Sequence, residues 1–420
     1  MKKWRNKIKM SSLLKEKIFE FAKEICNRRN HESELGFWIF HPDLTLDAIN
    51  HFKAALPNVK LYYAVKCNPN PYLVKFVTDN GGDGFDCASL NEIKEVIKLG
   101  MSPEKITYSQ IAKTSYEILE AYKLGVRLTL VDSNEEVDKL SKLKNEIPDL
   151  KIMIRIQSND PTADYSLGGR FGLEEDEIDD VLNNLYEKKL NMNGIHFHIG
   201  SLAHSSNAFR NGLRIAKETI DKAKKLGYNP NIIDIGGGFS HEVSIDHFGK
   251  VITDTIHEYN LDDITFIAEP GRYIAGNSFS YVANVIHKHK KKDLIYYTIC
   301  EGSHGAISCA SLFQKTYDCV PLFPKGGKMY YSVFGGQTCD SHDIVTEKNC
   351  EELNVGDWVI YYCLGAYSMS LCTNFNGFES RTRPIFHLPL QDTKETVKLP
   401  SDIEKNGIPA LWGLPGTWDL

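Results

Sequence analysis

Six short segments of the chain place reactive side chains directly after apolar, β-branched or aromatic runs. The residues at these positions are Lys66, Asp86, Arg155, His196 with His198, Asp234 followed by the glycines 236 to 238, and Glu269 with Arg272. A lysine that follows Leu, Tyr, Ala and Val on a strand is expected to be partly desolvated, which favours the neutral amine that forms a Schiff base. A structural ion pair between Lys66 and a carboxylate is the alternative, and this residue alone favours neither.

The glycine triplet after Asp234 suggests an anion site. Glycines let backbone N–H groups approach a phosphate closely, and Arg272 could add a charged donor. A tight turn without a ligand would explain Gly236 to Gly238 equally well.

His196 and His198 alternate along a run, so both would face one side and could bind a metal together with Asp234. The chain lacks an H-x-x-x-H pair and a nearby carboxylate cluster at ligand spacing. No metal is therefore expected, and His196 is interpreted as a hydrogen-bonded core histidine.

These segments belong to a regular alternation of strand and helix patterns between residues 60 and 271. The expected strands are eight: 60–67, 84–89, 106–110, 127–133, 151–158, 193–200, 231–238 and 265–271. The expected helices between them include 90–99, 115–124, 134–143, 174–188, 206–226 and 245–259. Such alternation predicts a parallel sheet, and eight units favour a (β/α)8 TIM-type barrel over a doubly wound open sheet. In a barrel the strand ends converge, so the reactive side chains would share one cavity.

A second, β-rich domain is predicted after residue 280, where short strand-like runs alternate with Gly, Pro, Asn and Asp. The expected strands are 296–299, 329–334, 358–362 and 385–390, and the run 35–40 is expected to join them. The predicted division is 1–43 for an N-terminal helix and strand, 44–279 for the barrel and 280–420 for the β-rich domain.

Composition excludes several classes of protein. The net charge of −6 and the 25% of charged residues do not suit a nucleic-acid-binding surface, and no window has the 18 apolar residues that a membrane span needs. The ten cysteines form no C-x-x-C pair, so reduced thiols and a cytoplasmic location are expected.

The motifs as a set resemble one known family. They are Tyr63 to Asn68 (YAVKCN), Gly84 to Ser89 (GFDCAS), His196 to Ser201 (HFHIGS), Asp234 to Gly238 (DIGGG), Glu269 to Tyr273 (EPGRY), Thr338 to Asp340 (TCD), Gly365 to Tyr367 (GAY) and Asn374 to Phe378 (NFNGF). In order and spacing the chain resembles the fold-type III decarboxylases that depend on pyridoxal phosphate (PLP), the ornithine decarboxylase family. The resemblance implies an alanine racemase-like barrel and an enzyme of polyamine biosynthesis.

The resemblance also implies roles for the strand-end residues. Lys66 would hold the cofactor covalently, Glu269 would keep its pyridine nitrogen protonated, and His198 would stack on its ring. The family pattern implies that Asp86, Glu92 and Arg155 support these groups. The phosphate would be bound by Ser201, Gly236, Gly237, Gly238, Gly271, Arg272 and Tyr367.

According to the same resemblance, four later residues would act on the substrate: Cys339, Asp340, Phe375 and Glu301. Cys339 would protonate the product carbanion and Asp340 would bind the distal cation, with Phe375 beside it. In this family Cys339 and Asp340 reach into the neighbouring subunit, which implies a homodimer with shared sites.

Glu301 is a departure, because ornithine-specific relatives carry Asp there. In a rigid pocket the longer acid would favour a shorter substrate, whereas resemblance to viral arginine decarboxylases favours arginine, so ornithine and arginine are nearly balanced with a slight preference for arginine. A neutral exchange that retains ornithine is the alternative at this position.

Other possibilities are an inactive regulatory homologue, a decarboxylase of lysine, diaminopimelate or an Nα-acylated basic amino acid, a racemase, and a metal-dependent hydrolase. The presence of Lys66 and Cys339 opposes the inactive homologue, and Glu269 opposes racemisation.

Overall fold

The chain folds into two compact units. The computed structural model describes residues 10–28, 34–167, 169–314, 316–378 and 384–389. One unit contains residues 46–66 and 77–274, and the other contains 1–45, 67–76 and 275–420. The sequence-based division placed 67–76 with the barrel, whereas the structure groups these residues with the β-rich unit.

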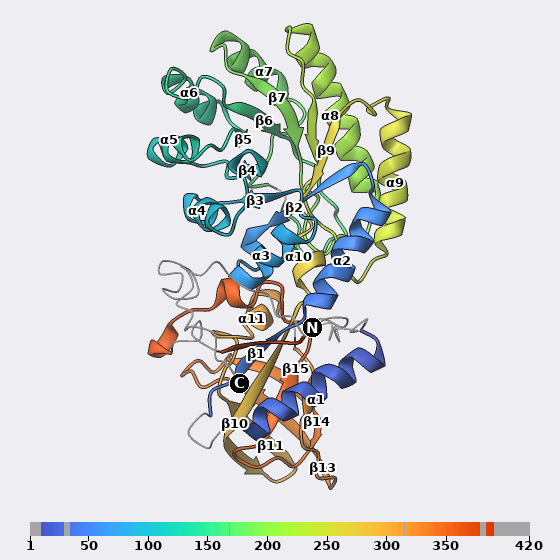
Figure 1. Cartoon of the computed structure of the whole chain (residues 1–420), viewed down its shortest axis with the longest axis vertical. Coiled ribbons are helices and arrows are strands. Elements are labelled where there is room, and N and C mark those ends of the chain that lie inside the picture. Colours follow the sequence, from blue (N-terminus) through green and yellow to red (C-terminus); the bar gives the residue numbers. More distant parts are fainter. Residues whose placement is uncertain (1–9, 29–33, 168, 315, 379–383, 390–420) are drawn as a thin grey trace. The chain divides into compact units, whose positions relative to one another are not determined.

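The first unit is a closed barrel of eight parallel strands, as the alternating pattern predicted (Figure 1). The strands are β2 (Val59–Ala64), β3 (Gly84–Cys87), β4 (Ile106–Tyr108), β5 (Leu128–Val131), β6 (Lys151–Arg155), β7 (Met192–His196), β8 (Ile232–Asp234) and β9 (Thr265–Ala268). Pairing of β2 with β9 closes the ring. Each strand is short, so the polar residues that follow it lie at one end of the barrel.

Helices surround these strands on the outside, as Figure 1 shows. They are α2 (Pro42–Ala55), α3 (Pro71–Asp79), α4 (Leu90–Lys98), α5 (Ser115–Lys123), α6 (Asn134–Lys142), α7 (Ile178–Glu187), α8 (Asn207–Lys225), α9 (Ile245–Glu258) and the short α10 (Gly271–Ala275), of which α2 and α3 are only partly within this unit. Hydroxyl side chains define three of the helix starts, because Ser89, Thr114 and Ser133 each accept a hydrogen bond from the backbone N–H three residues later.

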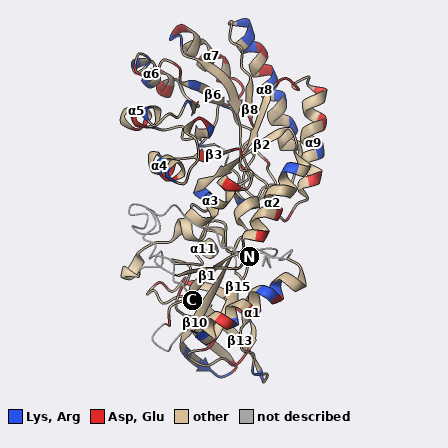
Figure 2. Cartoon of the chain, in the orientation of Figure 1, with Lys and Arg blue, Asp and Glu red and all other residues tan. Residues whose placement is uncertain are grey.

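The barrel helices are amphipathic. On α8 the residues Phe209, Leu213, Ala216 and Ile220 are buried at helical spacing, and Figure 2 shows that the same helix also contains basic and acidic residues. The mixture of signs on the barrel helices agrees with the small net charge of −6.

Apolar side chains fill the barrel interior. Tyr62, Leu128, Leu130, Met153 and Ile267 come from β2, β5, β6 and β9 and pack together in one cluster. Strands on opposite sides of a barrel can make such contacts only across its inside. Polar groups are thereby restricted to the ends of the strands.

The second unit contains an eight-stranded, mostly antiparallel sheet. Its strands are β1 (Phe37–Phe40), β10 (Phe279–Lys291), β11 (Leu294–Ile299), β12 (Cys319–Pro321), β13 (Met329–Gly335), β14 (Ile344–Glu351), β15 (Trp358–Tyr361) and β16 (Ile385–His387). The prediction that the N-terminal strand joins this sheet is confirmed, because β1 pairs with β10 and β16. The helix α1 (Ser12–Arg28) buries Ile18, Ala22 and Ile25 in the same core.

Three strands of this sheet were not predicted: β10, β12 and β14. The longest, β10, pairs with β1, β11 and β15. Its second half, from His287 to Lys291, is polar and mostly exposed, so its sequence lacks the apolar alternation by which a strand is recognised. In the part of the chain described above, no helix has the length and apolar character of a membrane span.

Candidate active site

Lys66 lies at the mouth of the barrel between two acidic side chains. It follows β2 in the short helix η1 (Val65–Cys67), so the expectation that it lies on the strand itself was wrong. Its Nζ forms an ion pair with Asp86 and lies 3.9 Å from Oε2 of Glu269. The lysine side chain is 38% exposed, whereas the Asp86 side chain is fully buried. The amine is therefore accessible while its acidic partners are held in the protein.

Three carboxyl groups are buried together at the strand ends. Asp86, Asp234 and Glu269 end or follow β3, β8 and β9, and each is at most 4% exposed. Burial, and then the charge of Glu269, raises the pKa of both Asp86 and Asp234. The charge of Lys66 opposes both shifts. This concentration of buried acid gives a cation at the barrel mouth a favourable environment.

Arg155 supplies a second positive charge to the cluster. It ends β6, and burial lowers its pKa while Glu269 and Asp132 act in the opposite direction. Its guanidinium lies 5.0 Å from the centre of the Phe171 ring. Arg155 thus balances part of the negative charge of the carboxyl groups.

His196 is a buried, hydrogen-bonded histidine, as the sequence indicated. Its Nε2 lies 3.3 Å from Oε1 of Glu269, and burial lowers its pKa well below the usual range. A neutral ring that faces a carboxylate carries its hydrogen on the facing nitrogen, so Nε2 donates to Glu269. This contact fixes the orientation of the Glu269 carboxyl group.

His198 lies beyond the end of β7, next to the glycine triplet. Burial lowers its pKa to about 3, so the ring is neutral near pH 7. Its Nδ1 accepts a hydrogen bond of 3.0 Å from the N–H of Gly200, which leaves the hydrogen on Nε2. A flat, neutral ring in this place suits stacking on an aromatic cofactor.

Gly236 and Gly237 are required by a close approach of two loops. A Cβ atom on Gly236 would lie 2.3 Å from the carbonyl oxygen of Phe197, and φ at this residue is +65°. A Cβ atom on Gly237 would lie 2.8 Å from Nε2 of His198. Side chains are therefore excluded here, which is a more specific reason for glycine than the sequence alone provided.

The residues predicted to bind phosphate include Ser201, Gly238 and Arg272, and hydrogen bonds connect their loops at the same end of the barrel. The Nε of Arg272 donates to Oγ of Ser201 at 3.3 Å, and the N–H of Ala203 donates to the carbonyl oxygen of Gly238 at 3.2 Å. Gly271 starts α10 directly before Arg272. A hydroxyl, a guanidinium and a glycine loop form a set of donors that suits a phosphate group.

The structure also brings three potential metal ligands together. One ligand atom from each of His196, Asp234 and Glu269 lies within 4.8 Å of the other two. This set differs from the one considered in the sequence, since His198 is replaced by Glu269. Both oxygens of Glu269 already have a partner without a metal, because Oε1 contacts His196 and Oε2 lies near Lys66. The same residues therefore also suit an organic cofactor.

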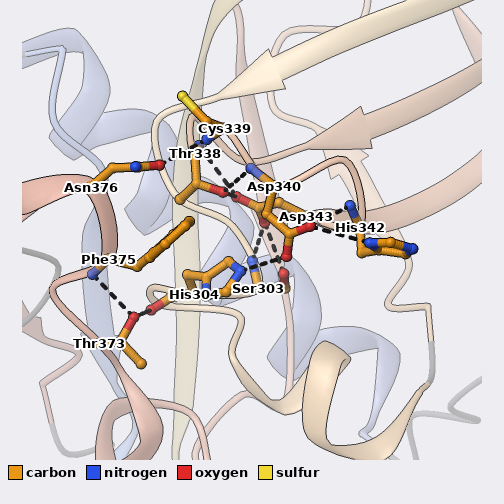
Figure 3. A network of polar contacts seen from close by, with 10 residues as sticks. All are labelled: Ser303, His304, Thr338, Cys339, Asp340, His342, Asp343, Thr373, Phe375 and Asn376. Atoms are coloured by element: carbon orange, nitrogen blue, oxygen red, sulfur yellow. Dashed lines mark hydrogen bonds and ion pairs between the residues drawn. The ribbon is translucent and has the colours of Figure 1, made fainter.

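Cys339 and Asp340 lie in the β-rich unit, in the loop after β13, and Figure 3 shows their surroundings. Cys339 is exposed, and its N–H donates to Oδ1 of Asn376 at 2.8 Å. Asp340 accepts a hydrogen bond of 2.8 Å from Nε2 of His304 and one of 2.9 Å from the N–H of His342. The bond from His304, first of all, lowers the pKa of Asp340 to about 2. Asp340 is therefore a partly exposed, ionised carboxylate.

Asp343 ties this loop to the loop that contains His304. Its side chain accepts from the N–H and Oγ of Ser303 at 2.6 and 2.9 Å and from Oγ1 of Thr338 at 2.7 Å. A Cβ atom on Gly302 would lie 2.1 Å from Oδ1 of Asp343, so glycine is needed for this approach. The two loops form one cross-linked platform (Figure 3).

The other residues predicted to bind substrate or phosphate also lie in the β-rich unit. Glu301 is 1% exposed, and its Oε2 accepts from the N–H of Ala306 at 3.2 Å. Phe375, which is 44% exposed, lies with its ring centre 4.8 Å from that of His304. Tyr367 has a φ of +56°, and its N–H donates to the carbonyl oxygen of Cys67 at 2.8 Å. Their contacts with substrate or phosphate stay predictions.

Sequence reasoning missed His304, Asp343 and Asn376 as parts of this platform. No periodic pattern marks them, because their contacts join residues on separate loops. The available signals were the glycines at 302 and 336 and the histidine two residues after Asp340.

Comparison with known proteins identifies the family. Residues 45–276 match the pyridoxal binding domain of pyridoxal-dependent decarboxylases. The chain belongs to this decarboxylase family. Ornithine decarboxylase of Caenorhabditis elegans is 34% identical over 84% of this chain and 88% of its own length. Antizyme inhibitor 2 of Xenopus laevis, a relative with a regulatory name, is 32% identical over 78% of this chain and 76% of its own length.

Two solved decarboxylase structures are similar to most of the chain. The arginine decarboxylase of Paramecium bursaria Chlorella virus, bound to agmatine, has a TM-score of 0.82 and 32% identity, and covers 88% of this chain and all of its own. The ornithine decarboxylase of Entamoeba histolytica has a TM-score of 0.74 and 36% identity, and covers 89% of this chain and 99% of its own. The chain is thus a PLP-dependent decarboxylase by family and by fold.

The barrel mouth of this decarboxylase fits its cofactor. Lys66 offers an exposed amine, the loop at Gly236 to Gly238 leaves no room for side chains beside His198, and Ser201 with Arg272 offers phosphate donors. PLP supplies an electron sink for the bond to the departing carboxylate. Glu269, whose carboxyl group is fixed by His196, would hold a proton on the ring nitrogen of the bound cofactor.

Proposed function

We propose that the chain decarboxylates L-ornithine to putrescine and so acts in polyamine biosynthesis. The main support for this proposal is that Asp340, an ionised and partly exposed carboxylate, directly follows the exposed thiol of Cys339. The acid would bind the distal cation of a basic amino acid, and the thiol would return a proton to Cα after carbon dioxide leaves. Lys66, Glu269, His198 and the phosphate donors would act on the cofactor side as assigned above.

The preference for ornithine is supported by the position of Glu301. Its carboxyl group is buried and accepts a hydrogen bond from the N–H of Ala306 in its own loop. The extra methylene of Glu, relative to Asp, therefore lets the carboxyl group reach this N–H. The exchange of Asp for Glu at this position would then be neutral and would retain ornithine as the substrate. The ornithine decarboxylases among the relatives, 34% and 36% identical, support the same substrate.

Arginine, which the sequence slightly favoured, is the second candidate. The likeness to the viral arginine decarboxylase, with a TM-score of 0.82, supports it. A guanidinium could also stack on the exposed ring of Phe375 beside Asp340.

We also propose a homodimer in which Cys339 and Asp340 of one subunit complete the site of the other. The family resemblance and the exposure of Cys339 support this assembly. The cytoplasmic location expected from the sequence stays a prediction.

The decisive experiment measures carbon dioxide release from ornithine, arginine, lysine and their Nα-acylated forms. The wild type and Glu301→Asp are compared, with saturating PLP in both cases. We expect ornithine to have the highest kcat/KM in the wild type. A higher kcat/KM for arginine would support the second candidate, and release from none of these substrates would support an inactive regulatory homologue.

A further inference from the structure

His304 forms a hydrogen bond with Asp340, the acid that is proposed to bind the substrate cation. Its Nε2 lies 2.8 Å from Oδ2 of Asp340, and the two side chains are 27% and 30% exposed. Because Asp340 is ionised, its oxygens can only accept, so Nε2 of His304 carries the hydrogen and donates. The bond is charge-assisted and fixes the carboxylate in one orientation.

The imidazole of His304 is itself held on a second side. The Phe375 ring packs against it at 4.8 Å with an angle of 33° between the planes. The carbonyl oxygen of His304 accepts from the N–H of Thr373 at 2.9 Å and from its Oγ1 at 3.2 Å. Residues 373–375 therefore support the ring and the backbone of His304 together, as Figure 3 shows.

The other oxygen of Asp340 contacts His342. Oδ1 accepts from the N–H of His342 at 2.9 Å and lies 3.2 Å from its Nδ1. The side chain of His342 is 92% exposed, so its ring has little to keep it in place. Of the two histidines, His304 is the one whose surroundings fix it against Asp340.

We infer that His304 is a positioning residue that sets the orientation of Asp340 for the distal cation of the substrate. The inference rests on the proposed function, because Asp340 must be the cation site. A carboxylate that is already oriented loses less conformational freedom when the substrate binds. Removal of His304 therefore weakens binding of the cation and leaves the chemical step at Cα unchanged.

The test compares two substrates that differ only at the distal end. Ornithine carries the terminal amine, and norvaline has the same carbon chain without it. The variants are His304→Ala, His304→Gln and Asp340→Asn, assayed as cofactor-loaded enzyme. His257→Ala is the matched control, because His257 forms an exposed pair with Asp262 on the barrel surface.

We expect His304→Ala to raise KM for ornithine by about tenfold or more with kcat nearly unchanged, since a hydrogen bond to a charged group is removed. His304→Gln should restore much of the loss, because its amide can donate at a similar reach. Activity on norvaline should be equal in wild type, His304→Ala and His257→Ala. A general structural defect would lower activity on both substrates and would overturn the inference.

The Asp340→Asn variant separates this inference from the proposed function. An increase in KM for ornithine in Asp340→Asn but none in His304→Ala would refute the role of His304 alone. An unchanged KM in Asp340→Asn would refute Asp340 as the cation site, and the role of His304 would fall with it.

Discussion

Nζ of Lys66 lies 3.9 Å from Oε2 of Glu269, on the side of that carboxyl group opposite to His196. The lysine comes from the turn after the first barrel strand, and the glutamate follows the last strand. Their proximity results from closure of the barrel, since β2 pairs with β9. Closure thereby brings together the amine proposed to hold the cofactor and the acid proposed to hold a proton on its ring.

Lys66→Ala is expected to abolish covalent attachment of the cofactor and to lower decarboxylation by several orders of magnitude. Borohydride reduction followed by peptide mass mapping should find the cofactor on Lys66 in the wild type. Lys113 is an internal control, because its side chain is fully buried and pairs with Glu136 at 2.9 Å. A label on Lys113 or on any other lysine, or no label at all, would contradict the assignment.

Glu269→Gln should retain the cofactor and lose about 10²-fold in kcat. Glutamine keeps the shape and can still accept from His196, but it removes the charge that stabilises a protonated ring nitrogen. The measurement is steady-state decarboxylation together with the visible absorption of the bound cofactor. Glu258→Gln, at an exposed pair with Arg210, should show no loss. Equal kcat in wild type and Glu269→Gln would remove Glu269 from the mechanism.

Cys339→Ala should keep the colour of the bound cofactor and lose correct product formation by about 10²-fold or more, which is the usual contribution of a positioned proton donor. The side chain is exposed, so its removal should leave the fold intact. Product analysis by mass spectrometry is the readout. Cys26→Ala, at a partly buried thiol on α1, is the control. Undiminished amine production by Cys339→Ala would show that another group protonates Cα.

The barrel was predictable because its information is local. Each strand is an apolar run that ends in polar residues, and helix starts such as Thr114 with Glu117 form a capping box that can be recognised in the sequence. The grouping of the candidate catalytic side chains on this unit follows directly, since parallel strands place their carboxyl ends on one side.

The platform in the β-rich unit could not be derived in the same way. The hydrogen bond between Asp343 and Ser303 joins residues 40 positions apart in the sequence, and the one between His304 and Asp340 joins residues 36 positions apart. Contacts at such separations depend on the parallel pairing of β11 with β13, which brings the loops after these two strands together. Both strands were predicted, but their pairing cannot be recognised from local sequence. Motif resemblance located Cys339 and Asp340, but the groups that position them became visible only in the folded unit.

Shared active sites should be revealed by complementation between two inactive variants. In a mixed dimer of Lys66→Ala and Cys339→Ala, one site would carry both changes and the other would carry neither. Random mixing of equal amounts should therefore restore activity at about a quarter of the sites. Each variant alone is the control, and sedimentation should show a dimer. No recovery in a dimer shown to exchange subunits would mean that Cys339 acts within its own chain.

Glu92→Gln should stabilise the protein at neutral and alkaline pH. Burial raises the pKa of Glu92 from 4.5 to about 7, although its Oε2 accepts from the N–H of Ala88 at 2.6 Å. A raised pKa means that the folded state favours the neutral acid. The contribution of Glu92 to stability is therefore complete below about pH 4.5 and is lost as pH rises through 7.

The Glu92→Gln variant stays neutral at every pH, and its amide oxygen can still accept from Ala88. Its advantage in free energy of unfolding should grow from near zero at about pH 5 to at most about 3 kcal/mol at about pH 8. Glu117 is the matched control with the opposite sign, because hydrogen bonds from Thr114 lower its pKa. Glu117→Gln should be less stable than the wild type by a constant amount above about pH 4.5, and this deficit should shrink as pH falls below that value. Urea unfolding across this range is the measurement, and a pH-independent difference for Glu92→Gln would show that this acid is ionised at all these pH values.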